Sequence, residues 1–299
     1  MPSTGADPWP GAQIASYRLE RLLGRGGLGS VFLARDAAGA ALALKVLDLG
    51  GSESAQLRLL FEREVESSRR LDHPGIVRIH DAGRAGTLAF IAMEFIGGGD
   101  LAHLRGSGRP FALQRAVHIV ARVARALAHA HAQGVVHRDI KPANILVDES
   151  SDLVKLADFG LARLSDLQRS RTGVLAGTPA YMSPEQLAEG AQDARTDLYS
   201  LGVVLFELLA GRLPHEADSL GSLLRQVSHS PAPPLLRLRP DTPPALSALV
   251  ARLLEKDRER RPSDARTLAL ELEALLRPSS HAADHAADSP AGTAPGRLE

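Results

Sequence analysis

Three side chains in the middle of this 299-residue chain have types and spacing suited to binding a hard cation and moving a proton. Asp139 and Asn144 lie five residues apart in HRDIKPAN, and Asp158 follows two short apolar runs separated by an acidic turn. That order predicts a strand, a turn and a second strand, so Asp158 should return close to Asp139 and Asn144. Two carboxylates and an amide oxygen suit Mg²⁺, which keeps its other positions for water and substrate phosphates.

A glycine-rich stretch near the N-terminus is the second candidate for ligand binding. Residues 17–23 alternate apolar and charged side chains as a half-buried strand does; GRGGLGSV follows from Gly24, and residues 31–34 fit a returning strand. In a dinucleotide-binding fold these glycines would open a helix. A second strand follows instead, which favours a hairpin whose backbone approaches phosphates, because glycine lacks a Cβ. Taken alone, the stretch is equally consistent with a flexible hairpin.

Two charged residues follow in elements that should be partly buried. Lys45 interrupts the apolar run of residues 41–47. A buried lysine needs an anionic partner, although a solvated strand lysine would also fit. Residues 55–71 have helical periodicity and include Glu64, with a further glutamate two positions away on either side. The spacing therefore does not choose among the three glutamates.

Composition limits the classes of protein that this chain can be. The 35 basic and 35 acidic residues cancel, so no whole-chain field favours nucleic acid or an anionic membrane. The lack of cysteine excludes disulfides and thiolate catalysis and is consistent with a cytoplasmic location. The N-terminus lacks the basic start and apolar stretch of a signal peptide. Residues 198–209 are too few to span a membrane, and we expect a buried helix there.

Periodicity predicts the remaining elements. The expected strands and helices lie at residues 76–80, 88–93, 113–132, 196–211, 246–254 and 267–276. His118, His129 and His131 lack partners at convincing ligand spacing, so we interpret them as solvated or packed rather than metal-binding. From Pro278 the composition turns to Ala, Ser, Pro, Asp and His, which is typical of a disordered tail.

HRDIKPAN followed by DFG, with a short hairpin between them, resembles the catalytic and metal-binding loops of eukaryotic-type (Hanks-type) serine/threonine protein kinases, bacterial members included. The resemblance implies an α+β, two-lobed protein kinase fold. The N-lobe is a small antiparallel β-sheet plus one helix, and the C-lobe is larger and mostly helical. The implied divisions are a flexible leader at residues 1–14, a kinase domain at 15–277 (N-lobe 15–96, C-lobe 97–277) and a disordered low-complexity tail at 278–299.

The resemblance also implies roles in phosphoryl transfer. Asp139 would orient or accept the substrate hydroxyl, and Lys141 would offset charge on the γ-phosphate. Asn144 and Asp158 would hold Mg²⁺, with Mn²⁺ as an alternative ion.

Nucleotide binding is assigned in the same way. Lys45 would hold the α and β phosphates of ATP and Glu64 would pair with Lys45, which is how the resemblance selects this glutamate. The adenine would lie against the backbone of Glu94 and Ile96. The implied nucleotide-binding residues are Leu23, Gly24, Gly26, Gly29, Val31, Ala43, Lys45, Met93, Glu94, Ile96, Asp100 and Leu146.

Arg138, next to Asp139, implies regulation by phosphorylation, because in such kinases this arginine binds a phosphate on the activation segment. The segment spans residues 158–185, and its hydroxyl residues include Ser165, Ser170, Thr172 and Thr178. Ser170 and Thr172 are the candidate phosphosites, and Thr178 is expected to line the substrate-binding loop and contact Asp139. A polar loop that is never modified is the alternative.

The resemblance predicts supporting contacts and shows one departure. The implied contacts are His137 beneath Phe159, Asp197 below the catalytic loop, and Glu185 with Arg261. Ser68, one turn after Glu64, stands where the family often has an apolar residue. We therefore hypothesise that activation needs phosphorylation, a dimer contact or substrate.

These expectations favour an ATP- and Mg²⁺-dependent, non-specific serine/threonine protein kinase that autophosphorylates. Its partners would be protein substrates and a second copy for phosphorylation in trans, with no nucleic acid and no membrane span. One alternative is a pseudokinase scaffold, which should lack one of Lys45, Asp139, Asn144 or Asp158; all four are present. The other is a small-molecule phosphotransferase, but the long segment at residues 172–185 suits a protein substrate better.

Overall fold

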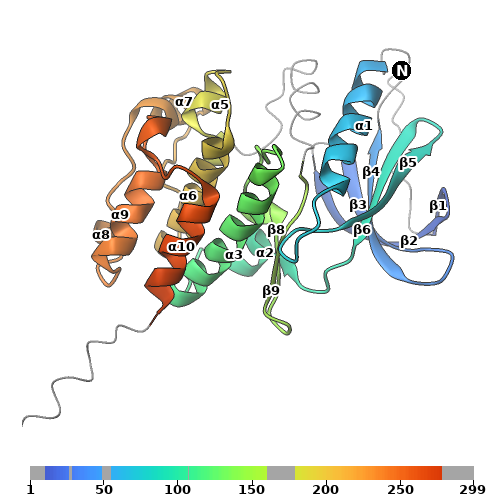
Figure 1. Cartoon of the computed structure of the whole chain (residues 1–299), viewed down its shortest axis with the longest axis horizontal. Coiled ribbons are helices and arrows are strands. Elements are labelled where there is room, and N and C mark those ends of the chain that lie inside the picture. Colours follow the sequence, from blue (N-terminus) through green and yellow to red (C-terminus); the bar gives the residue numbers. More distant parts are fainter. Residues whose placement is uncertain (1–10, 27–28, 49–54, 107, 160–178, 278–299) are drawn as a thin grey trace, which may run out of the picture.

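The computed structural model describes residues 11–26, 29–48, 55–106, 108–159 and 179–277. Figure 1 shows two parts: a β-sheet with helix α1 (Ala55–Arg69) beside it, and a larger group of helices that begins beyond strand β6. The predicted two-lobed α+β arrangement, with a small sheet and one helix followed by a larger helical part, is confirmed.

The N-terminal part is a six-stranded antiparallel sheet in the order β1-β2-β3-β4-β6-β5. Its strands are β1 (Gln13–Ile14), β2 (Tyr17–Gly26), β3 (Gly29–Arg35), β4 (Ala41–Asp48), β5 (Ile79–Ala85) and β6 (Leu88–Glu94). Alternation explains its core: in β3, Ser30, Phe32 and Ala34 are buried and their neighbours are less so, as the two-residue period of a strand requires.

Two details of the sheet differ from the sequence-based expectation. Gln13 and Ile14 pair with β2, so the last residues of the predicted leader belong to the sheet; residues 1–10 lie outside the described part. The strand expected at residues 76–80 begins at Ile79 instead. The backbone just before it pairs with another strand instead, because Val77 N–H donates to Leu156 O at 3.0 Å and Leu156 N–H donates to Gly75 O at 2.8 Å.

The C-terminal part is built around α6 (Ala194–Ala210), which is buried from Thr196 to Leu209. Asp193 caps its first turn, and Gly211, with φ of 74°, ends it in the left-handed conformation that glycine tolerates. Helix α3 (Leu113–Ala132) packs against α6 and α10 (Ala265–Leu276). The remaining helices among the described residues are α2 (Leu101–Arg105), α5 (Pro184–Leu187), α7 (Leu220–His229), α8 (Leu235–Leu238) and α9 (Pro244–Leu253), with short 3₁₀ turns at Pro142–Asn144, Pro179–Tyr181 and Arg258–Arg260.

A small sheet between the two parts positions the candidate site (Figure 1). It has the order β7-β8-β9, with β7 (Gly99–Asp100), β8 (Ile145–Asp148) and β9 (Leu153–Leu156). Its hairpin β8–β9 lies against α3. In the described part of the chain, no helix is both long enough and apolar enough to cross a membrane.

Candidate active site

The hairpin predicted between Asn144 and Asp158 is present, and its ends meet. Ile145 pairs with Leu156 and Asp148 with Leu153. Beyond the last pair, Ala157 N–H donates to Asn144 O at 2.9 Å. This contact places the residue before Asp158 against the residue expected to share its metal ion, so the return of the chain is confirmed.

Asp139 is held by two neighbours in its own loop. Lys141 Nζ lies 2.7 Å from Asp139 Oδ2. Asn144 Nδ2 donates both to the carbonyl of Asp139 at 2.7 Å and to its Oδ2 at 3.1 Å. Because Nδ2 is committed to Asp139, the amide oxygen of Asn144 is turned away from that carboxylate, as a metal ligand would need. The Asp139 side chain remains 35% exposed, so a substrate hydroxyl can reach it.

Asp158 joins the site through Lys45. Lys45 Nζ lies 2.7 Å from Asp158 Oδ2, and the side chains are 8% and 27% exposed. Burial alone would raise the pKa of Asp158, but the charge and hydrogen bond of Lys45 outweigh it and hold the pKa below its ordinary value of 3.8. Asp158 is therefore ionised at neutral pH and can offer carboxylate oxygens to a divalent cation.

Two residues of the site have left-handed backbone: Arg138, with φ of 64°, and Asp158, with φ of 65°. Such conformations cost about 1 kcal/mol or more in non-glycine residues and persist where the surroundings enforce them. Hydrogen bonds hold the backbone around Arg138 in this conformation. Asp197 accepts from the N–H of His137 at 2.8 Å and of Arg138 at 2.7 Å, and Gln186 Nε2 donates to Arg138 O at 2.8 Å.

His137 supports the loop rather than facing the substrate. Its ring meets Phe159 edge-on, with centroids 4.6 Å apart, and its Nε2 lies 2.8 Å from Ala157 O. His137 is fully buried. The predicted packing of His137 against Phe159, and the predicted support from Asp197, are both present.

The glycine-rich stretch contributes the two paired strands expected of a hairpin, and residues 27–28 between them lie outside the described residues. Gly26 pairs with Gly29 across its tip, and Gly24 pairs with Val31. At Gly29, φ is +146° and a Cβ would lie 2.0 Å from Val46 O, so only glycine fits there. Leu23 is 37% exposed beside this hairpin.

Four of the predicted nucleotide-binding residues lie in one apolar cluster. Ala43 and Met93 are buried together with Val77, and Val31 and Leu146 pack against them. The cluster therefore joins β3, β4 and β6 of the N-terminal sheet to β8 of the small sheet.

At the connection between the lobes, the side chain of Glu94 points away from this cluster. Its carboxylate accepts from Lys155 Nζ at 2.5 Å and from Arg78 N–H at 2.7 Å. Asp100 Oδ1 accepts from His103 N–H at 2.8 Å and caps α2. Both are predicted ligand-binding residues. These contacts fix their side chains, while the role of the backbone of Glu94 and Ile96 stays a prediction.

Other predicted residues are not tested by the geometry. Glu64 lies on α1, and its pairing with Lys45 stays a prediction. Ser165, Ser170, Thr172 and Thr178 lie outside the described residues. The three histidines of α3 have protein partners: His118 lies 3.3 Å from Asp152, His129 2.7 Å from Gln133, and His131 2.7 Å from Asp197.

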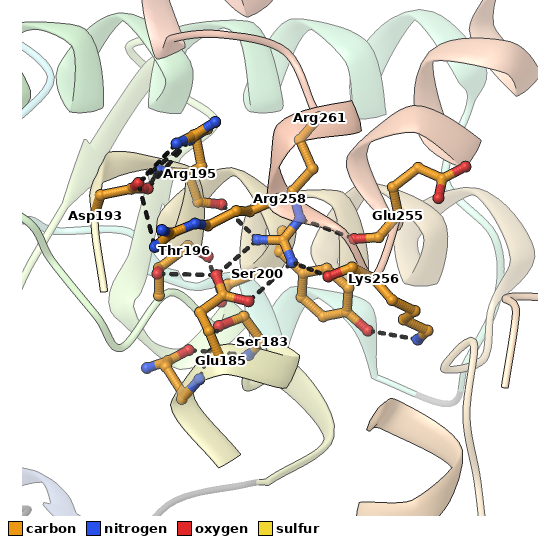
Figure 2. A network of polar contacts seen from close by, with 12 residues as sticks. Ser183, Glu185, Asp193, Arg195, Thr196, Ser200, Glu255, Lys256, Arg258 and Arg261 are labelled. Atoms are coloured by element: carbon orange, nitrogen blue, oxygen red, sulfur yellow. Dashed lines mark hydrogen bonds and ion pairs between the residues drawn. The ribbon is translucent and has the colours of Figure 1, made fainter. Parts of the chain in front are cut away.

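Behind the site, Glu185 and Arg261 form the predicted pair, shown in Figure 2. Arg261 Nη1 and Nη2 donate to the two carboxylate oxygens of Glu185 at 2.7 and 2.9 Å. Thr196 Oγ1 donates to the same carboxylate at 3.0 Å. Burial would raise the pKa of Glu185, but Arg261 outweighs it and holds the pKa below the ordinary 4.5. The pair anchors the end of the segment that begins at Asp158.

Comparison with known sequences decides the family. The family described as "Protein kinase domain" matches residues 17–272. The chain belongs to the protein kinase family. The matched range includes every residue of the candidate active site discussed above and the Glu185–Arg261 pair. The resemblance found in the central loop therefore extends over the whole kinase fold.

Curated bacterial kinases are similar to this kinase domain. "Serine/threonine-protein kinase pkn3" of Myxococcus xanthus is 40% identical over 290 residues, covering 92% of this chain and 53% of the relative. "Serine/threonine-protein kinase PknJ" of Mycobacterium bovis is 42% identical over 260 residues, covering 84% and 44%. "Serine/threonine-protein kinase PknD" of Mycobacterium tuberculosis is 41% identical over 268 residues, covering 89% and 40%. The chain spans about half the length of the curated relatives it matches.

Sequence reasoning missed several residues that support the kinase site. Gln186 is one, although Ser183 and Gln186 form a capping box, a pattern readable from their three-residue spacing. Lys155 gave no such signal. A buried group on α6 also went unnoticed: Glu207, 1% exposed, pairs with Arg105 at 2.8 Å and accepts from Tyr181 OH at 2.6 Å.

Proposed function

We propose that this chain is a serine/threonine protein kinase that transfers the γ-phosphoryl group of ATP, with Mg²⁺, to protein hydroxyls. The observation that carries the proposal is the convergence of Lys45, Asp139, Asn144 and Asp158 at the end of one hairpin, with Lys45 and Asp158 2.7 Å apart and Asn144 bonded to Asp139. The names of the curated relatives, serine/threonine-protein kinases, support serine and threonine as acceptors.

The residues present fit a Mg²⁺–ATP complex. Asp158 is ionised and Asn144 has its amide nitrogen committed elsewhere, so each offers an oxygen to a hard cation. When bound, Mg²⁺ would neutralise charge on the phosphates. Gly24 has open space where a Cβ would stand, and Lys45 supplies a cation for the phosphate chain once Asp158 turns to the metal.

The chemistry left to the protein is alignment and proton handling. Asp139 Oδ2, oriented by Lys141 and Asn144, accepts the proton of the incoming hydroxyl. Lys141 lies beside that oxygen and offsets negative charge on the transferring group. We further propose that the kinase phosphorylates its own segment in trans, at Ser170 or Thr172, through a transient pair of copies.

Incubation with Mg²⁺, labelled ATP and casein tests the proposal. We expect phosphoserine and phosphothreonine on the substrate and on the kinase. Asp139→Ala should lower turnover by about 10²–10⁴-fold, the usual contribution of a general base, while the affinity for Mg²⁺–ATP stays near that of the parent. Lys45→Met should weaken nucleotide binding instead. Nucleotide binding without any transfer by the parent would favour the pseudokinase alternative.

A mixing experiment tests phosphorylation in trans. Asp139→Ala with a larger tag cannot label itself, so its labelling by the untagged parent would report transfer between copies. Mass spectrometry should then find phosphate at Ser170 or Thr172 of the larger protein. Label confined to the parent, at a rate independent of protein concentration, would contradict the paired copies but leave the kinase proposal intact.

A further inference from the structure

Ser68 connects helix α1 to the backbone of Phe159. Its Oγ lies 2.9 Å from Phe159 O, a residue 91 positions later, and 2.8 Å from Glu64 O. Ser68 is 5% exposed and so is Phe159. The residue that departs from the family's apolar pattern therefore makes a buried polar contact with the segment that carries Asp158.

The single hydroxyl proton of Ser68 is best used in the hydrogen bond to Phe159 O. A serine hydroxyl can donate one hydrogen bond, and two carbonyl oxygens lie within reach. Glu64 O stands four residues before Ser68 in α1, so it already has the Ser68 backbone N–H as its helical donor. Among the described residues, Ser68 Oγ is the donor that reaches Phe159 O, and a buried carbonyl without a donor is unfavourable. Donation to Phe159 O is therefore more favourable than donation to Glu64 O.

The position of Phe159 sets that of Asp158. Asp158 has left-handed backbone, which the chain must enforce from both sides. On the side before it, Ala157 N–H donates to Asn144 O at 2.9 Å. On the side after it, the Phe159 ring meets His137 and the Phe159 carbonyl meets Ser68. These contacts fix the direction in which the Asp158 carboxylate leaves the backbone.

The space beside Ser68 shows that apolar packing alone does not fix the position of Phe159. A cavity of about 20 Å³ remains there, lined by Ser68, Met93, Asp158, Phe159 and neighbouring isoleucines. A void of that size holds about one water molecule. A larger apolar side chain at position 68 would fill it but could not donate to Phe159 O. The serine thus replaces apolar contact with a hydrogen bond.

We propose that Ser68 is a positioning residue whose hydroxyl, by donating to Phe159 O, aligns Asp158 for the divalent cation. The inference rests on the proposed function for its catalytic consequence, but its effect on metal-dependent nucleotide binding can be measured without turnover. It also accounts for the departure noted in the sequence: α1 is tied to the metal-binding segment by a polar contact.

A matched pair of variants isolates the hydroxyl. Ser68→Thr keeps it and Ser68→Val lacks it, while the two side chains have nearly the same shape. We expect Ser68→Val to require about tenfold more Mg²⁺ for tight ATP binding and for half-maximal turnover, the size of effect seen when a support of a metal ligand is lost. Ser68→Thr should behave as the parent does. Binding of ATP without metal should be equal in all three proteins.

Ser67 supplies the control, because it lies on the same helix and its Oγ donates only within that helix, to Arg63 O at 3.0 Å, among its described contacts. Ser67→Ala should leave the Mg²⁺ dependence unchanged. Equal Mg²⁺ dependence for Ser68→Thr and Ser68→Val would overturn the inference. So would a Ser68→Leu variant that matches the parent, because it would show that apolar packing suffices.

The two proposals fail in different ways. A parent that binds Mg²⁺–ATP but transfers no phosphate contradicts the proposed function, while the threonine and valine variants still test Ser68 by binding. A parent that phosphorylates casein, with no difference between those variants, contradicts only the role of Ser68. Thermal unfolding of each variant identifies any general loss of structure.

Discussion

Two clusters of oppositely charged side chains in this kinase differ in how many of their hydrogen-bonding positions are occupied. Arg261, fully buried at the side chain, has five N–H groups and five acceptors. They are the two oxygens of Glu185 and the carbonyls of Arg195, Glu255 and Lys256 (Figure 2).

In the candidate active site, by contrast, the contacts that described residues make to the Asp139 and Asp158 carboxylates fall on Oδ2 of each. Those side chains are 35% and 27% exposed. A carboxylate has about four lone-pair positions, so both retain capacity for a cation or a hydroxyl. The first cluster is arranged to hold the fold, and the second is arranged to receive a ligand.

The largest effect should come from breaking the cluster in the candidate active site. Asp158→Asn keeps the shape but removes the charge that would bind Mg²⁺. We expect turnover to fall by about 100-fold or more, comparable to the loss of a group that stabilises charge in the transition state. The unfolding free energy, from urea titration, should change less than in Arg261→Ala. A fully active Asp158→Asn would contradict its assignment as a metal ligand.

Breaking the saturated cluster should mainly reduce stability. Arg261→Ala leaves Glu185 buried without its cation, which should lower the unfolding free energy by about 3–5 kcal/mol. Arg252→Ala is the matched control, because Arg252 pairs with Glu271 on the surface, with exposures of 47% and 36%. Its effect should stay below about 1 kcal/mol. Equal losses in the two variants would show that burial does not distinguish these pairs.

The pH dependence of the unfolding free energy at acid pH tests the same comparison. The pKa of Glu185 is held below 4.5 by Arg261, so the pair stabilises the fold above pH 4.5. That contribution is lost as pH falls through the lower pKa of the folded state. Glu185→Gln should therefore flatten the pH dependence of the urea midpoint below pH 4.5. An unchanged slope would indicate that other carboxylates dominate acid unfolding.

A smaller trend of the same sign is expected at alkaline pH, from a lysine beside Arg261. Burial and the charge of Arg261 lower the pKa of Lys256 from 10.5 to about 8. Its ammonium donates to Tyr199 OH and lies 3.1 Å from His215 Nε2. Above pH 8 the folded chain releases this proton before the unfolded chain does, so stability rises with pH up to about 10, where tyrosines begin to ionise. Lys256→Met should remove the rise, as measured by urea midpoints; a persistent rise would assign it to another group.

Local patterns in the sequence were enough to predict much of the fold. The helix at residues 113–132 was predicted with both ends correct, because its apolar period of 3.6 is uninterrupted. The β8–β9 hairpin was predicted because two short apolar runs flank an acidic turn. The strand expected at residues 76–80 was wrong in its start, since Val77 pairs with Leu156 of another strand. No local pattern records such a competing partner.

The sequence by itself determined which residues can do chemistry, because Asp139, Asn144 and Asp158 owe their proximity to one hairpin whose turn and strands are local. Only the tertiary structure decided how they are held. Lys45 meets Asp158 across 113 positions, and Ser68 meets Phe159 across 91. These contacts depend on how α1 and the N-terminal sheet pack against the hairpin, and a hydrogen bond between distant residues leaves no periodic trace along the chain.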